Sequence, residues 1–168
     1  MSENVEMKHE PAAEKTDNVI KVLLVEPEQY PRKVEISPGL ESLQKAVGGD
    51  IEAVYPYSDN VALVMNESGK IDGLPLNRAL RDDEGQIYDA VAGSFLVVGL
   101  GEEDFSSLTD HQMEKYEKLF HQPEAFLRVN RKLMVIPIPD ESLPQNSKAK
   151  AAVDQIDRAV KSVGSEAR

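Results

Sequence analysis

Residues 48–80 read GGDIEAVYPYSDNVALVMNESGKIDGLPLNRAL and contain the strongest fold signal in the chain. Two apolar runs, Ile51–Tyr57 and Val61–Met65, are separated by the short polar sequence SDN, which is typical of a turn. A third turn follows at Asn66–Lys70, and we expect Gly69 to take a positive φ there. The segment therefore predicts a β-hairpin whose strands belong to the core and whose exit loop is polar.

Further strand signals flank this hairpin. Val19–Glu26 and Arg32–Ile36 predict an opening pair of strands, and Gly93–Leu100 predicts another buried strand. Leu133–Ile138 predicts a last strand, which its prolines place at the edge of a sheet because proline has no N–H for the ladder. The segment Gly73–Arg78 reads as a loop.

The first helix signal follows the second predicted strand. Ser37 stands before a Pro-Gly pair and is expected to cap the free N–H groups of a helix. Leu40, Leu43 and Val47 share one helical face, and Gly48 suits the left-handed position that ends a helix.

A second helix is predicted at Leu108–Phe120. Thr109 and Gln112 have the spacing of a capping box, in which each side chain satisfies a backbone N–H of the other. Met113 and Tyr116 lie on its apolar stripe.

These elements predict one α+β domain at residues 18–140, with a small mixed or antiparallel sheet and two main helices. We expect residues 1–17 to be a disordered tail, since they are polar and show no periodicity. Residues 141–168 are expected to be a flexible lead with a short amphipathic helix. The apolar positions that recur at helical spacing in this segment are Val153, Ile156, Val160 and Val163.

Composition narrows the classes of function. The 168 residues include no cysteine, which excludes disulfides, thiolate zinc sites and a cysteine nucleophile. No apolar stretch resembles a signal peptide or approaches the roughly 20 residues needed to span a bilayer, so a cytoplasmic location with no membrane partner is expected. The net charge of −11 argues against broad direct nucleic-acid binding, because an acidic body repels phosphate.

The sequence predicts neither a metal site nor a cofactor. His111 and His121 are about 15 Å apart along one helix, too far to share a metal ion there. Two runs of carboxylates, Asp82-Asp83-Glu84 and Glu102-Glu103-Asp104, lack the alternate spacing of a calcium loop. The simpler interpretation is that these runs are solvated loops. The more specific interpretation is that they form an acidic surface that binds a basic protein. The second interpretation assigns partner binding to Asp82, Asp83, Glu102 and Glu103.

The sequence shows no recognisable set of catalytic residues. Whether the chain is an enzyme stays open, and a non-enzymatic function is favoured. The best ligand-binding hypothesis concerns the polar side chains at the end of the central hairpin. These are Asn66, Glu67, Lys70, Asn77 and Arg78. Asparagine and arginine together offer a neutral donor–acceptor pair and a cationic fork for phosphate or carboxylate. In the structural alternative, the asparagines satisfy loop backbone groups and Arg78 pairs with Glu67 or Asp89.

Four blocks of sequence carry a family resemblance. They are LQKAVGGDIEAV at 43–54, ALVMNESGKIDGLPLNRAL at 62–80, GSFLVVG at 93–99 and FSSLTDHQMEKY at 105–116. In order and spacing they resemble domain-of-unknown-function family 3846, across roughly residues 19–120. The resemblance implies an accessory protein of phages, plasmids and integrative conjugative elements, and it supplies no catalytic residues.

The sequence is therefore compatible with three functions. The leading hypothesis is a non-enzymatic accessory protein that binds another macromolecule, such as a host defence or nucleic-acid-processing protein, in an anti-restriction or other anti-defence role. The alternative is a protein that binds or processes a small ligand or nucleotide with the loop after the central hairpin. A third is a complex formed through the helix predicted at Val153–Val163.

Overall fold

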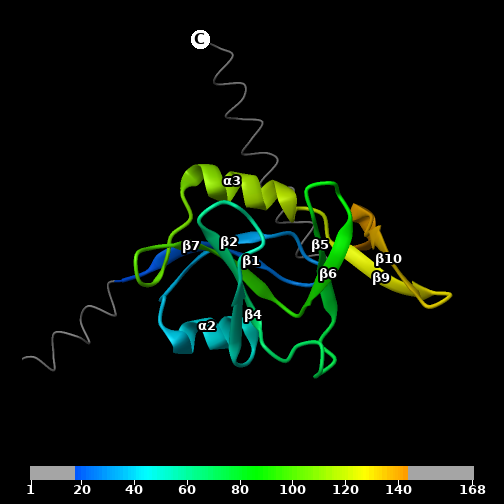
Figure 1. The fold of residues 1–168 in the computed structure, drawn as a ribbon, viewed down its shortest axis with the longest axis horizontal. Coiled ribbons are helices and arrows are strands. Elements are labelled where there is room, and N and C mark those ends of the chain that lie inside the picture. The colour runs from blue at the N-terminus through cyan, green and yellow to red at the C-terminus, as the bar shows by residue number, and fades with distance from the viewer. Residues whose placement is uncertain (1–17, 144–168) are drawn as a thin grey trace, which may run out of the picture.

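The computed structural model describes residues 18–143. Within them the fold is α+β, as predicted, with antiparallel sheets and two α-helices (Figure 1). The tail predicted at 1–17 and the helix predicted at Val153–Val163 lie outside the described residues. No helix in the described part is long and apolar enough to cross a membrane.

A six-stranded sheet forms the centre of the described fold, in the order β2-β1-β7-β4-β3, with β8 paired to β7. Every pairing is antiparallel, which settles the choice between a mixed and an antiparallel sheet. Its strands are β1 (Ile20–Val25), β2 (Arg32–Ile36), β3 (Ile51–Val54), β4 (Val61–Asn66), β7 (Phe95–Leu100) and β8 (Phe105–Ser106).

Two further hairpins stand beside this sheet. They are β5 (Leu76–Arg81) with β6 (Ile87–Ala92), and β9 (Glu124–Val129) with β10 (Lys132–Pro137), followed by the 3-10 helix η1 (Asp140–Ser142). The prediction that Gly73–Arg78 is a loop is wrong, because β5 begins at Leu76. The strand was missed since its sequence, LNRALR, has no apolar alternation, although its middle four residues are all buried.

Helix α2 (Leu40–Val47) differs from its prediction at the start. Gly39 occupies the N-cap position, without a side-chain cap, and the Ser37 hydroxyl accepts a hydrogen bond of 3.2 Å from the Gly39 N–H instead. Leu40 is exposed, whereas Leu43 and Val47 are buried as predicted. Gly48 ends the helix with a φ of 82°, in the left-handed region.

The capping box predicted for α3 (Asp110–Leu119) is confirmed. The Gln112 N–H donates to the Thr109 hydroxyl over 3.0 Å, and the Thr109 N–H donates to the Gln112 side chain over 3.0 Å. Met113 and Tyr116 are buried, so the predicted apolar stripe packs on the core.

The helices cover opposite faces of the central sheet (Figure 1). Ile20 and Val22 of β1 pack in a cluster with α2, while Leu23 and Val25 pack in a cluster with α3. Because both faces of β1 are buried, its sequence is a nearly continuous apolar run rather than an alternating one. Leu80 of β5 joins the second cluster, so the β5–β6 hairpin shares the α3 face.

Gly69 is required for a reason other than the predicted one. Its φ is not positive, whereas Gly73 has a φ of 77°. A Cβ at Gly69 would lie 2.7 Å from the carbonyl oxygen of Ala92, so only glycine allows the turn after β4 to pass this close to the end of β6. The predicted turn is present, and its glycine serves close approach.

Candidate functional site

Asn77 is completely buried in β5. Its side-chain amide donates hydrogen bonds of 2.9 Å to the carbonyl oxygens of Val25 and Gly93. Its side-chain oxygen accepts a hydrogen bond of 2.9 Å from the Arg78 guanidinium. The amide therefore joins three strand ends inside the protein, and none of its surface faces solvent.

Arg78 is also buried, with 1% of its surface exposed. Its Nε donates to the carbonyl oxygen of Phe120 over 2.9 Å, and its Nη2 donates to that of Gln29 over 2.7 Å. Burial lowers the pKa of Arg78 to about 10, so the group remains charged at neutral pH. The prediction that Arg78 pairs with Glu67 or Asp89 is wrong. Among the described residues, Arg78 donates to backbone oxygens and to the side-chain oxygen of Asn77.

Asn66 closes the end of the central hairpin. Its side-chain oxygen accepts a hydrogen bond of 2.9 Å from the Ser68 N–H, and its amide donates to the carbonyl oxygen of Val47 over 3.3 Å. The side chain is 7% exposed. The prediction that the two asparagines satisfy backbone groups holds for both, and for Asn66 this stabilises the turn between β4 and the following loop.

Lys70 forms an ion pair with Asp89 of β6. Burial alone would raise the pKa of Asp89, but the hydrogen bonds from Lys70 and from the Ala90 N–H outweigh it, and the pKa is lowered. Both side chains are about half exposed. This ion pair links the turn after β4 to the β5–β6 hairpin at the protein surface.

A groove of about 580 Å³ lies between strands β3 and β4 and the β5–β6 hairpin. We call it the β3–β6 groove. Val54 and Met65 contribute to its lining and are partly buried against the core. Three of the five residues predicted for ligand binding, Asn66, Glu67 and Lys70, also line it.

Large exposed side chains border the same groove. Tyr55, after β3, is 61% exposed, Tyr88 of β6 is 54% exposed, and Ile71 in the intervening turn is 89% exposed. A folded chain usually leaves few such groups in one place unless they meet a partner. The hydrophobic pattern of the sequence could not reveal this cluster, because the three residues come from three different segments.

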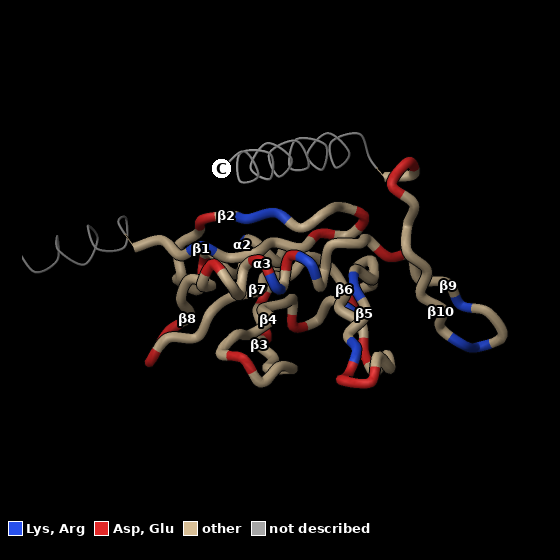
Figure 2. Tube along the Cα trace, turned by 90° about the horizontal axis from the view of Figure 1, so that it is seen from above, with Lys and Arg blue, Asp and Glu red and all other residues tan. Residues whose placement is uncertain are grey.

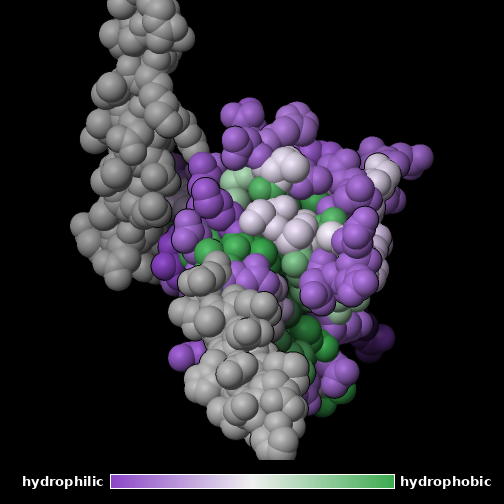
Figure 3. Space-filling model, turned by 90° about the vertical axis from the view of Figure 1, so that its left-hand side faces the viewer, coloured by the Kyte–Doolittle hydropathy of each residue, from purple (hydrophilic) through white to green (hydrophobic). Residues whose placement is uncertain are grey.

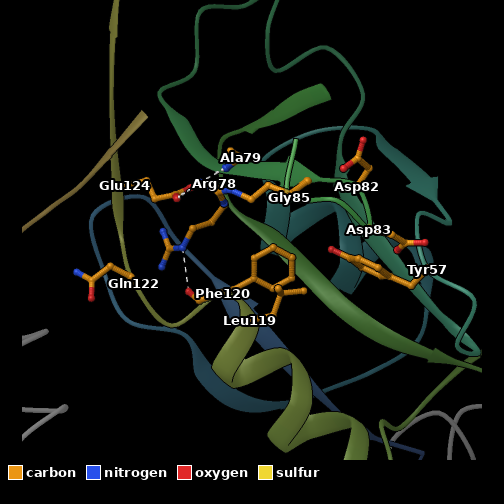
Figure 4. A pocket seen from close by; sticks show the side chains of 11 residues that line it. Tyr57, Arg78, Ala79, Asp82, Asp83, Gly85, Leu119, Phe120, Gln122 and Glu124 are labelled. Carbon is orange, nitrogen blue, oxygen red and sulfur yellow. Dashed lines mark hydrogen bonds and ion pairs between the residues drawn. The ribbon is translucent and has the colours of Figure 1, made fainter. Parts of the chain in front are cut away.

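A smaller pocket of about 330 Å³ lies between the C-terminal end of α3 and the β5–β6 turn. Figure 4 shows Arg78 directed to the Phe120 carbonyl and Glu124 directed to Ala79. Glu124 accepts hydrogen bonds of 2.8 Å from both the Ala79 N–H and the Arg81 guanidinium. The strongest polar groups of this pocket are thus already engaged, and it offers a ligand less than the β3–β6 groove.

The two acidic runs do not come together. Asp82 and Asp83 lie in the β5–β6 turn, and Glu102 and Glu103 lie between β7 and β8; the two turns are well separated (Figure 2). Within its turn, Asp82 accepts hydrogen bonds of 2.9 Å from two backbone N–H groups. The end that carries the β7–β8 turn is mainly hydrophilic, with a strip of neutral and apolar side chains across it (Figure 3).

A polar contact between α3 and the turn before β4 was not predicted from the sequence. The Asp59 carboxylate accepts hydrogen bonds of 2.6 Å from Lys115 and 2.9 Å from the Tyr116 hydroxyl. These bonds lower the pKa of Asp59, that of Lys115 contributing most. Tyr57 packs on Tyr116 with ring centroids 5.1 Å apart. Since Asp59 and Lys115 are 56 residues apart, no local sequence pattern predicts the contact.

The described residues contain no group of three or more histidine or acidic side chains placed to hold a metal ion. His121 packs against the ring of Tyr30, with centroids 4.8 Å apart. His111 is exposed at the start of α3.

The fold of the described residues is α+β, and its larger hollow is the β3–β6 groove. Residues 20–121 match the family described as Domain of unknown function (DUF3846), and the chain belongs to this family. The β9–β10 hairpin lies after the matched region. Comparisons with curated proteins and with solved structures found no match.

Proposed function

We propose that this protein is a non-enzymatic binding module that recognises an extended segment of a partner protein at the β3–β6 groove. The observation that carries the proposal is the gathering of Tyr55, Tyr88 and Ile71 around one hollow. Exposed tyrosines suit recognition because they offer a large apolar area together with a hydroxyl that can donate or accept a hydrogen bond.

An open strand edge beside the groove supports an extended ligand. Strand β3 ends the six-stranded sheet and pairs with β4 alone among the described residues. A peptide that lies along such an edge gains main-chain hydrogen bonds, and its alternate side chains enter the neighbouring hollow. The apolar lining at Val54 and Met65 would receive those side chains.

The charges of the groove define the partner further. Glu52 and Glu67 line it, and Lys70 is neutralised by Asp89, so the groove is acidic on balance. A segment that combines apolar or aromatic side chains with Lys or Arg is the expected ligand. In the mobile-element setting that the family resemblance implies, the partner is a host defence or nucleic-acid-processing protein, and an anti-restriction role is one form of this proposal.

The test uses a library of random linear peptides selected on the immobilised full chain. We expect enrichment of basic, aromatic-containing peptides that bind the native chain and lose at least tenfold in affinity to a Tyr55→Ser/Tyr88→Ser variant. Leu40→Ser, on the outer face of α2, is the matched control because Leu40 is 58% exposed and lies outside the groove.

Backbone NMR then locates the bound peptide. Shifts concentrated at Ile51–Val54 and at Tyr88 are expected when a selected peptide is added. Failure to enrich any peptide, or equal binding by the tyrosine variant, would refute this function.

A small-ligand function is the second candidate, and one observation favours it. The groove volume of about 580 Å³ lies within the range of small-molecule pockets, and Asn66, Glu67 and Lys70 line it. Asn77 and Arg78 are turned into the interior and are not available to such a ligand. The candidate predicts that millimolar mononucleotides raise the melting temperature of the chain and that Lys70→Ala abolishes the rise. No rise with any nucleotide removes it.

A further inference from the structure

The β9–β10 hairpin forms an arm, residues 124–137, that extends away from the other elements (Figures 1 and 2). Its two-residue turn is formed by Asn130 and Arg131, which have φ values of 51° and 68°. Both angles suit a tight hairpin turn that follows the natural twist of the strands. The arm lies beyond residues 20–121, so it is an addition to the family domain.

One face of the arm is mainly apolar and is exposed to solvent. The register places Ala125 opposite Ile136, Leu127 opposite Met134 and Val129 opposite Lys132, and directly paired residues share a face. The four large apolar side chains of this face are 40–47% exposed. With Leu133 on the other face, the arm holds five of the twelve exposed large apolar side chains in the described part of the chain. This concentration needs a covering surface.

The charges of the arm are arranged from end to end. Arg128, Arg131 and Lys132 stand near the tip, and none of them is in an ion pair within the described residues. Asp140 and Glu141 follow the base of the arm, in η1. Figure 2 shows the basic residues at the loop and the acidic turn at the opposite end. Six residues of strand span about 20 Å. This exceeds the screening length of about 8 Å, so the ends act as separate charges.

We infer that the arm is the interface of a homodimer in which two arms pack face to face, antiparallel, about a two-fold axis. This arrangement places Leu127 against Leu127 of the second copy and covers the apolar face with an identical one. It also places the basic tip of each arm beside the acidic base of the other. A second copy is the occupant because one two-fold rotation satisfies both the apolar face and the charge pattern.

The inferred interface is small. A hairpin face about 20 Å long and two strands wide is well below the roughly 800 Å² that each partner contributes to a standard interface. The dimer is therefore expected to be weak and to dissociate on dilution. The arm does not line the β3–β6 groove, so this inference goes beyond the proposed function and does not depend on it.

Sedimentation velocity on the full chain tests the association. Between about 1 and 300 μM protein, the mass should rise from the 18.6 kDa of one chain toward twice that value. A Leu127→Glu/Met134→Glu variant should remain a single chain throughout. Leu40→Glu/Ile87→Glu is the matched control, since it places the same two charges on side chains that are 58% and 44% exposed and lie outside the arm. The control should dimerise like the native chain.

Cross-linking tests the antiparallel geometry. Because the chain has no cysteine, single cysteines can be introduced cleanly. With a short bismaleimide, Leu127→Cys should cross-link to its own copy, since position 127 lies at the axis. Asn130→Cys should not, since the two tips lie at opposite ends. Cross-linking of Asn130→Cys but not of Leu127→Cys would overturn the antiparallel pairing.

Charge-reversal variants test whether the charges at the ends of the arm contribute to the dimer in addition to its apolar face. Arg131→Glu/Lys132→Glu should weaken the dimer at least tenfold at low salt, and this difference should shrink as salt is raised. A native chain that remains a monomer at about 300 μM would overturn the inference and assign the apolar face to another occupant, such as residues 144–168 or a different protein. Dimerisation of the Leu127→Glu/Met134→Glu variant would overturn it as well.

Discussion

The guanidinium of Arg78 donates a hydrogen bond of 2.9 Å to the carbonyl oxygen of Phe120 and so joins strand β5 to the C-terminal end of α3. The last carbonyl groups of a helix have no partner within the helix and carry partial negative charge, which favours a cation at this place. The same group binds Gln29 in the connection from β1 to β2. A residue whose sequence context predicts ligand binding thus stabilises the contact of three segments.

Replacement of Arg78 by methionine is expected to lower the free energy of unfolding by about 3 kcal/mol, because buried carbonyl oxygens lose a charged donor. Arg81→Met is the matched control. Arg81 is 40% exposed, and Glu124 keeps the hydrogen bond from the Ala79 N–H, so loss of the ion pair should cost less than about 1 kcal/mol. Urea denaturation measures both values. Equal effects would show that the buried contact is not special.

The contact of Asp59 with Lys115 predicts a pH dependence. The pKa of Asp59 is lowered in the folded chain, so its contribution is present above the unfolded pKa of about 3.9 and is lost as pH falls through the folded value. The difference in melting temperature between the native chain and Asp59→Ala should be constant from about pH 5 to 8 and should shrink below about pH 4. A difference that persists unchanged at pH 2 contradicts the assignment.

The two glycines of the turn after β4 should respond differently to alanine. Gly69→Ala places a Cβ 2.7 Å from a backbone oxygen that cannot easily move, and it should cost about 2 to 3 kcal/mol. Gly73→Ala meets open space but keeps a φ of 77°, so it should cost about 1 kcal/mol. Denaturation with urea ranks them. The reverse order would show that backbone conformation, rather than close approach, dominates this turn.

Two tyrosines in the segment Tyr55-Pro56-Tyr57 should separate binding from stability. Tyr57 is partly buried and packs on Tyr116, so Tyr57→Ala should cost about 2 kcal/mol. Tyr55 borders the groove and is 61% exposed, so Tyr55→Ala should change stability by less than about 0.5 kcal/mol while weakening peptide binding. Thermal unfolding and fluorescence anisotropy measure the two effects. A large loss of stability at Tyr55 would assign it to the fold.

Local chemistry made several elements predictable. The capping box at Thr109 and the left-handed glycine at Gly48 are formed by residues within four positions of each other, so the sequence contains all the atoms that take part. The strands around Val22 and Val64 are predictable for a related reason, since central strands buried on both faces are almost entirely apolar. Both strands lie within residues 20–121, which match the family.

Strand β5 and the candidate site were less predictable. Asn77 and Arg78 are polar, and a polar pair next to a proline-containing turn indicates a loop. In the structure they donate hydrogen bonds inside the core to carbonyl oxygens up to 52 positions away. The ligand-binding set divides for this reason. Asn66, Glu67 and Lys70 line the groove, whereas Asn77 and Arg78 are buried.

The sequence by itself determined an α+β domain, its two helices with the capping box of α3, and the central hairpin within residues 48–80, because caps, turns and buried strands depend on neighbouring residues. Only the tertiary structure decided which polar side chains of that segment reach solvent. It also decided that Tyr55, Ile71 and Tyr88 border one groove and that the arm leaves an apolar face uncovered. These properties depend on which distant segments pack together. Contacts between segments far apart in the sequence produce no hydrophobic periodicity from which they could be predicted.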